Sequence, residues 1–214
     1  MILSSVGQNR PFVGNFPFIG LLPPLVTEAR KYMDDDARQV DICNHGDARD
    51  AAKAFETLYK RHKDFVIRVA LRFVPDNDSA LDVLQETFTY LLRKFPPTGP
   101  GLTLTASLTS LLYPVAKNNA LTLRRKSDRF PHSDDVLPDD LPAATNDGPS
   151  DIPALLSDLP DGRREVLMLR FVDDLSLQDI ATALDIPLGT VKSRLHLALK
   201  TLRESPEAKK LLSP

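Results

Sequence analysis

The 214-residue chain contains no tryptophan, one cysteine and four histidines. A lone cysteine, Cys43, excludes an internal disulfide and a cysteine-rich zinc site, and it indicates a reduced thiol in a cytoplasm. The histidines at positions 45, 62, 132 and 196 lack the spacing of metal ligands. No nucleophile–base pair and no glycine-rich phosphate loop stands out in the sequence either. We therefore expect a protein that is not an enzyme and that needs no metal and no cofactor.

The chain also lacks any run of about 20 apolar residues, so we expect no segment to span a membrane. The apolar stretch from Phe12 to Val26 is interrupted by three prolines and preceded by a single cation, Arg10, so it is a poor signal peptide. No segment alternates apolar and polar residues convincingly, as a half-buried strand does. The expected fold is all-α, with two small helical domains joined by a flexible acidic linker.

Residues 176–200 have the pattern of a helix-turn-helix. Ile180 and Leu184 give the first helix a buried stripe, and residues 185–187 interrupt the helical period. Pro187 suits the first position of a new helix, where the amide hydrogen that it lacks would have no partner. Between Pro187 and Arg203 every charged residue is a cation. This basic face suits DNA, although a solvated amphipathic helix would also be polar on one side.

Three further helices are predicted upstream, where apolar residues recur at helical spacing over 55–69, 81–95 and 108–121. Asp76-Asn-Asp-Ser79 supplies candidate caps for the second of these helices, and Pro96-Pro97 ends it. Its expected buried face consists of Leu81, Leu84, Phe88, Leu91, Leu92 and Phe95.

Composition divides the chain into five segments. Residues 1–44 are predicted to be a flexible extension, with Met33 a candidate for the true start of the protein. Residues 45–129 form the first helical domain, 130–151 the linker, 152–205 the helix-turn-helix domain and 206–214 a tail. The stretch from Asp128 to Asp151 holds seven aspartates and one arginine. The net charge of −2 therefore hides two basic regions, one before the linker and one near the C-terminus.

Four sequence runs resemble bacterial sigma factors of the extracytoplasmic-function (ECF) type. The runs are Phe55-Glu-Thr-Leu-Tyr59, Asp82-Val-Leu-Gln-Glu-Thr-Phe88, Val115-Ala-Lys-Asn118 with Arg124-Arg125, and Leu159-Pro-Asp-Gly-Arg-Arg-Glu-Val-Leu-Met-Leu-Arg-Phe171 with Leu188-Gly-Thr-Val-Lys-Ser-Arg-Leu195. The resemblance implies a cytoplasmic sigma factor that binds core RNA polymerase and directs promoter-specific initiation. It also implies an anti-sigma factor as a further partner.

The resemblance implies that the second helix binds core polymerase. Polar residues lie opposite its apolar face at i, i+3, i+4 and i+7. The predicted core-binding residues are Asp82, Gln85, Glu86 and Thr89. A polar stripe of this kind also fits a surface that is only solvated.

The third helix resembles the segment that melts the promoter and contacts the minus-ten element. The predicted DNA-binding residues are Lys117, Asn118, Arg124, Arg125 and Lys126. Alternatively, these cations only complement the dipole of the helix C-terminus. The family usually has Trp seven residues before the Asn and Asp four residues after it, where this chain has Leu111 and Thr122. The loop at 95–105 captures a flipped base in the family; here, apart from Phe95 at its edge, it offers Thr98, Thr103 and Thr105 rather than aromatic rings.

The helix-turn-helix resembles the winged-helix-like sigma region 4, which reads the minus-thirty-five element. Amides and hydroxyls at a helix N-terminus favour phosphate, and Lys192 or Arg194 suits guanine. The predicted DNA-binding residues are Gly189, Thr190, Lys192, Ser193, Arg194 and His196.

Two other functions fit parts of the sequence. A helix-turn-helix regulator that works without polymerase would explain the second domain and leave the first unexplained. A degenerate sigma-like module that binds a protein partner without melting promoters would explain Leu111 and Thr122. The acidic linker is either simply solvated or, as the resemblance implies, directed toward the active-site cleft of the polymerase.

Overall fold

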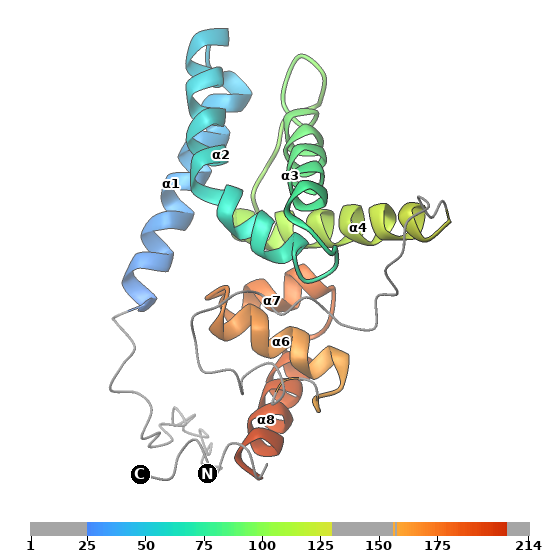
Figure 1. Cartoon of the computed structure of the whole chain (residues 1–214). Coiled ribbons are helices and arrows are strands. Elements are labelled where there is room, and N and C mark those ends of the chain that lie inside the picture. Colours follow the sequence, from blue (N-terminus) through green and yellow to red (C-terminus); the bar gives the residue numbers. More distant parts are fainter. Residues whose placement is uncertain (1–24, 130–155, 157, 205–214) are drawn as a thin grey trace, which may run out of the picture.

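The computed structural model describes residues 25–129, 156 and 158–204, and only the backbone of residues 25–34, 128 and 129. These residues form seven α-helices and no strand (Figure 1), which confirms the all-α prediction. The predicted linker at 130–151 and the tail at 206–214 lie outside the described residues. No helix of the described part is long and apolar enough to cross a membrane.

Four helices form the first domain: α1 (Leu25–His45), α2 (Ala48–Ala70), α3 (Asn77–Leu92) and α4 (Leu108–Arg129). α2 lies at its centre and contacts the other three. Leu58, Val66, Leu91 and Leu112, from α2, α3 and α4, are completely or almost completely buried. Burying such a side chain contributes about 1.5–3 kcal/mol, so this shared apolar core holds the four helices together.

Side-chain caps fix where two of these helices begin. The Asp47 carboxylate accepts hydrogen bonds from the amides of Arg49 and Asp50 at the start of α2. The Asp76 carboxylate accepts from the amide and the hydroxyl of Ser79 at the start of α3. Each such cap stabilises its helix by about 1 kcal/mol. The cap predicted from residues 76–79 is thus confirmed.

The prediction of a flexible extension up to residue 44 was wrong for residues 25–44, which belong to α1. Residues 35–44 form the second half of this helix, which packs along α2, with Val40 and Cys43 buried. Asp36 is buried as well, because His62 Nε2 lies 2.8 Å from its carboxylate and Arg61 pairs with it. From the sequence alone, the run of aspartates at 34–36 suggested a solvated segment, because the basic residues of α2 that pair with Asp36 could not be identified.

The docking of α1 makes a testable prediction about Cys43. Its thiol is buried and lies 3.6 Å from the Ala51 carbonyl, and burial raises the pKa of Cys43 to about 11. Since the thiolate is the reactive form, we expect alkylation of the native protein to be at least about 100-fold slower than that of the unfolded chain. Timed labelling with and without urea measures the ratio, and equal rates would mean that α1 is not docked.

The expected buried face of α3 needs a correction. Leu84, Phe88 and Leu91 are buried as predicted, but Leu81 and Leu92 are each 52% exposed. Ala80, Val83 and Thr87 are buried in their place, because α3 packs against both α2 and α4. The buried stripe therefore lies to one side of the predicted one, and two leucines remain at the surface.

The second domain consists of α6 (Asp161–Phe171), α7 (Leu177–Leu184) and α8 (Leu188–Glu204). The helix-turn-helix is confirmed: Ser176 caps α7, and Asp185 ends it in the left-handed conformation with φ of 51°. α8 begins one residue after Pro187, whose carbonyl accepts the hydrogen bonds of Thr190 and Val191. Ile180 and Val191 are fully buried where the two helices meet.

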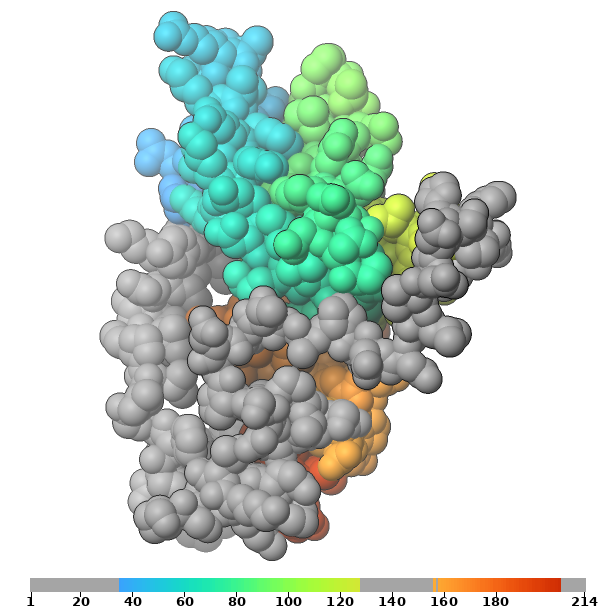
Figure 2. Space-filling view, in the orientation of Figure 1, coloured from blue at the N-terminus to red at the C-terminus, as the bar shows by residue number. Residues whose placement is uncertain are grey.

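The two domains are in direct contact. α4 packs on α7, and the buried core of the first domain continues into Leu175, Ile180 and Ala181 of the second. The Ser107 amide donates a hydrogen bond to Asp179 at 3.0 Å across this contact. In the space-filling view the orange second domain lies against the lower side of the cyan and green first domain (Figure 2).

Candidate nucleic-acid and protein interfaces

The start of α8 presents a polar, basic surface. Gly189, Lys192, Ser193 and His196 are exposed, whereas Thr190 and Arg194 are half-buried. A side chain at Gly189 would meet no atom within 4 Å, and its φ is not positive, so neither packing nor backbone conformation requires glycine there. Free space at a helix N-terminus lets a phosphate approach the backbone amides.

Arg194 differs from its neighbours because it leans on α6. Its guanidinium lies 3.2–3.6 Å from the point where a Cβ of Gly162 would stand. The lack of a side chain at Gly162 therefore leaves the room that Arg194 occupies. Lys192 and His196, by contrast, are exposed to solvent. Among the predicted DNA-binding cations of α8, Lys192 is therefore fully accessible, whereas Arg194 is partly covered by α6.

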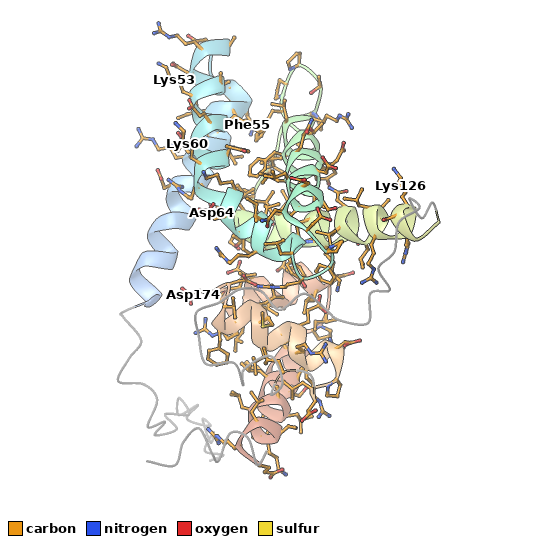
Figure 3. All side chains as sticks on the ribbon, viewed as in Figure 1. Lys53, Phe55, Lys60, Asp64, Lys126 and Asp174 are labelled. Atoms are coloured by element: carbon orange, nitrogen blue, oxygen red, sulfur yellow. The ribbon has the colours of Figure 1, made fainter. Side chains whose placement is uncertain are left out.

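The second half of α4 carries the other basic surface. Asn118, Arg124, Arg125 and Lys126 are exposed, and Figure 3 shows Lys126 pointing away from the body of the protein. Leu111, which stands where the family usually has Trp, is half-buried and packs against the core. The start of α4, rather than its basic second half, is thus supported by an apolar contact at the position of the absent indole.

Lys117 is the exception among the predicted DNA-binding residues of α4. It is half-buried, and its ammonium pairs with Glu165 of α6. The hydroxyl of Tyr113, one turn earlier, donates a hydrogen bond to the same Glu165 oxygen at 2.5 Å. Burial, with a contribution from Glu165, raises the pKa of the Tyr113 phenol far above its usual range, so the hydroxyl stays a donor. This contact was not predictable from the sequence, since its partners are 48 residues or more apart.

The loop between α3 and α4 is held by the end of α1. The Asn44 amide donates to the Leu102 carbonyl at 2.8 Å and accepts from the Leu102 amide at 2.9 Å. Gly101 has a φ of 95°, and a Cβ added to it would lie only 3.2 Å from Asn44 Oδ1. Thr98, Thr103 and Thr105 are exposed on this anchored loop. The sequence gives no signal for this anchor, because Asn44 and Leu102 are 58 residues apart. Residue 44 was therefore predicted to belong to a flexible segment.

α3 offers a surface of mixed character. Asp82, Gln85 and Glu86 are exposed and Thr89 is half-buried. Gln85 and Thr89 also line a groove of about 420 Å³ between α2 and α3, together with Phe55, Tyr59, Leu81, Leu84, Phe88 and Leu92. The polar stripe that the sequence predicts is therefore joined by an apolar strip, which suits a protein partner better than solvent alone.

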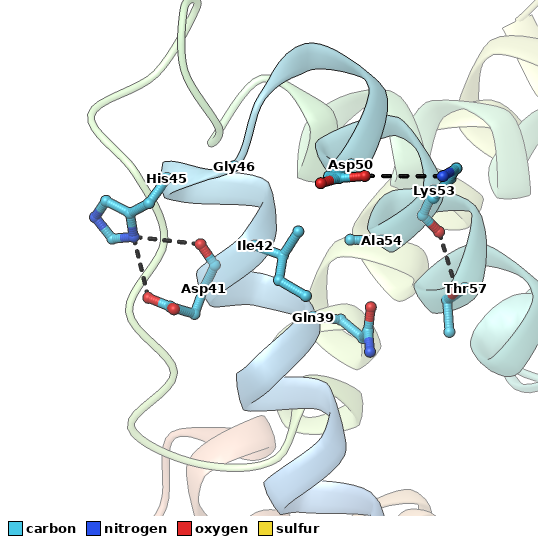
Figure 4. A pocket seen from close by; sticks show the side chains of 9 residues that line it. All are labelled: Gln39, Asp41, Ile42, His45, Gly46, Asp50, Lys53, Ala54 and Thr57. Carbon is cyan, nitrogen blue, oxygen red and sulfur yellow. Dashed lines mark hydrogen bonds and ion pairs between the residues drawn. The ribbon is translucent and has the colours of Figure 1, made fainter.

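Another surface hollow lies between α1 and α2 and holds no reactive group. It measures about 490 Å³, and its polar side chains pair within their own helices: His45 Nδ1 with Asp41 at 3.0 Å, and Lys53 with Asp50 at 3.8 Å (Figure 4). Nowhere in the described part of the chain do three histidine, cysteine or acidic residues gather as metal ligands would.

Comparison with known proteins shows the family of the chain. Sigma-70 region 2 matches residues 58–130, and Sigma-70 region 4 matches residues 150–202. The ECF RNA polymerase sigma factor SigL of Mycobacterium tuberculosis is 33% identical over 168 residues, which cover 74% of this chain and 92% of that protein. SigW of Bacillus subtilis is 28% identical over 171 residues, 71% of this chain and 88% of that protein.

A solved structure has a similar fold. It is that of the sigma factor RpoE in complex with the anti-sigma factor NepR from Bartonella quintana, with a TM-score of 0.53 and 22% identity. The alignment covers 75% of this chain and 99% of that chain.

Proposed function

The chain belongs to the ECF RNA polymerase sigma factors, and we propose that its surfaces on α3, α4 and α8 each bind a different target during promoter recognition. The protein binds core RNA polymerase and directs it to promoters in the cytoplasm, where the polymerase works. It contributes binding energy and no catalysis of its own. Residues 45–129 and 152–205 are the two working domains, and α1 belongs to the first.

α3 is the core-binding helix. Asp82, Gln85, Glu86 and Thr89 supply polar contacts, and the adjacent groove adds buried apolar area. A combination of charged and apolar groups gives both orientation and affinity, because the charges steer the partner and the apolar strip excludes water.

α4 and α8 bind the promoter. Asn118, Arg124, Arg125 and Lys126 contact the minus-ten region, together with the anchored loop at 98–105, and Lys117 joins them when it is free of Glu165. Gly189, Thr190, Lys192, Ser193, Arg194 and His196 form the minus-thirty-five surface. Phosphates take most of the cations and amides, while Lys192 or Arg194 reads a base edge.

The observation that carries this proposal is that the chain leaves exposed the helix faces that these tasks require. Asp82 and Glu86 of α3, Arg125 of α4 and Lys192 of α8 are all exposed. A polymerase-independent regulator has no use for the first two, so the surface of α3 favours a sigma factor.

Reconstitution with core polymerase tests the proposal. The labelled protein is expected to bind core saturably at one copy per enzyme, and the complex to melt promoter DNA, detected as permanganate-reactive thymines. Binding without melting would favour the degenerate sigma-like module. Absence of binding to core would refute the proposal and leave the conventional regulator.

A protein partner of the anti-sigma class is part of the proposal. The RpoE structure of similar fold contains the anti-sigma factor NepR. The exposed apolar residues of α3, Leu81 and Leu92, give such a partner a surface that overlaps the core-binding one. Competition between the two partners for α3 would keep the protein inactive.

A further inference from the structure

The first half of the loop between α3 and α4 is held by hydrogen bonds of its own. The Gly99 amide donates to the Phe95 carbonyl at 2.8 Å, and the Gly101 amide donates to the Lys94 carbonyl at 3.0 Å. The Thr98 hydroxyl donates to the Phe95 carbonyl at 3.1 Å. Phe95 itself is buried. This half of the loop is therefore folded back onto the turn that follows α3.

The second half of the loop depends on Asn44. Along residues 102–105, Leu102 and Leu104 are half-buried and pack against the core, whereas Thr103 and Thr105 are exposed. The Asn44 amide group donates to the Leu102 carbonyl and accepts from the Leu102 amide. The Leu102 carbonyl belongs to the planar peptide unit that ends at the Thr103 Cα. Asn44 therefore fixes the plane from which the Thr103 side chain projects.

This contact ties the loop to α1. The loop and the turn between α1 and α2 lie at the same end of the first domain, at the top of Figure 1. Gly101 has a φ of 95°, which disfavours a side chain, and a Cβ there would crowd Asn44 Oδ1 at 3.2 Å. Both Gly101 and Asn44 are thus needed for the close approach of the loop to α1.

The composition of the loop makes its position important. No aromatic residue occurs between positions 96 and 105. An aromatic ring would hold an unpaired base by stacking, whichever base it is. Hydroxyls and backbone groups hold a base by hydrogen bonds, which are directional. Such groups must lie within about 0.5 Å of their productive position. Base selection by this loop therefore depends on the contacts that fix its backbone.

We propose that Asn44 is a positioning residue for promoter selection. By holding both backbone groups of Leu102, it presents the hydroxyls of Thr103 and Thr105 to an unpaired base of the minus-ten element and determines which base is accepted at one position. Asn44 itself does not contact the DNA. The inference rests on the proposed function, because that function places the loop at 98–105 against the minus-ten region.

Two variants break the contact from opposite sides, and a third is their control. Asn44→Ala removes both hydrogen bonds to Leu102, and Gly101→Ala places a methyl group against Asn44. His45→Ala changes the next residue of α1, which is exposed and whose Nδ1 pairs with Asp41 of the same helix (Figure 4). The control therefore alters the same end of α1 without touching the loop contact.

Hydrogen exchange of the full chain, without polymerase or DNA, tests whether Asn44 holds the loop. In Asn44→Ala the Leu102 amide is expected to exchange at least about tenfold faster, because its hydrogen bond is lost. Exchange in α3 and α4 should not change, and His45→Ala should behave as the parent. Unchanged exchange at Leu102 would overturn the inference, and so would faster exchange throughout the first domain, which would make Asn44 a general support of the fold.

Selection of DNA by the assembled holoenzyme tests specificity. The probe is a pool of duplexes randomised over the length of a promoter, and sequencing of the bound fraction gives the base preference at each position. Asn44→Ala and Gly101→Ala are each expected to lower the preference at one minus-ten position by at least about fivefold. Core affinity and the other positions should stay within about twofold of the parent, as should every position in His45→Ala.

Asn44→Asp separates hydrogen bonding from packing. It keeps the size of the side chain and the acceptor for the Leu102 amide, but it sets a carboxylate oxygen against the Leu102 carbonyl. We expect it to lose the same base preference as Asn44→Ala. Full preference in Asn44→Asp would show that packing, rather than the paired hydrogen bonds, positions the loop, and would contradict the inference.

The two proposals fail in different ways. If the parent holoenzyme selects motifs and Asn44→Ala keeps the same preference at every position, the inference is wrong and the proposed function stands. An equal loss at all positions would also refute it, because a structural defect acts on all of them alike. A parent holoenzyme that selects no motif would refute the proposed function, and the inference with it.

Discussion

Asp82→Arg/Glu86→Arg is expected to weaken binding to core RNA polymerase by about 100-fold or more while leaving the helical content unchanged. Both side chains are exposed on α3, so the substitutions disturb no buried contact. Like charges placed against a complementary surface cost several kcal/mol, which exceeds what the adjacent apolar groove can compensate. Fluorescence anisotropy of the labelled protein with core enzyme measures the loss.

The matched control is Glu56→Arg/Asp64→Arg. These residues are exposed on α2, and Figure 3 shows Asp64 on the side away from α3, as it does Lys60, the ion-pair partner of Glu56. The control changes the net charge by the same amount and should retain core affinity within about twofold, since surface pairs contribute little. An unchanged affinity in Asp82→Arg/Glu86→Arg would remove α3 from the core interface.

Lys192→Glu is expected to weaken binding of the assembled holoenzyme to promoter DNA by roughly 10- to 100-fold. The side chain is exposed near the start of α8, where Gly189 leaves the backbone open to a phosphate. A carboxylate there replaces an attraction to DNA by a repulsion. Titration at one fixed salt concentration measures the change, because phosphate contacts are salt-dependent.

Lys60→Glu provides the comparison, because it makes the same charge change on α2, far from α8, and should leave DNA affinity nearly unchanged. Lys192→Ala then separates two roles. If Lys192 reads a base, this variant loses discrimination at one position of the minus-thirty-five element. If it contacts only phosphate, affinity falls uniformly across sequences. Equal affinity of Lys192→Glu and the parent would exclude Lys192 from the interface.

Local chemistry made the helix-turn-helix predictable from sequence. Pro187 and the periodic apolar residues each act over one or two turns, and the structure has a break and a second helix where they indicate. The position of α8 was correct to one residue. The exposure of Lys192 and His196 follows from the same periodicity.

Features that depend on tertiary partners were not predictable in this way. The aspartates before α2 resemble a solvated run until His62 and Arg61 are seen to pair with Asp36. A signal was present, since His62 falls on the apolar face of its helix and a buried imidazole needs a partner. The Lys117–Glu165 and Asn44–Leu102 contacts join residues 48 and 58 positions apart, and neither partner differs from an ordinary surface residue in sequence.

The measurement that tests the central claim most directly is transcription by bacterial core polymerase with this protein and fragmented genomic DNA from its source, followed by mapping of transcript starts. The sigma-factor account predicts defined starts that share two upstream motifs at a fixed spacing and that vanish with Asp82→Arg/Glu86→Arg. Starts no different from those of core polymerase alone would contradict it.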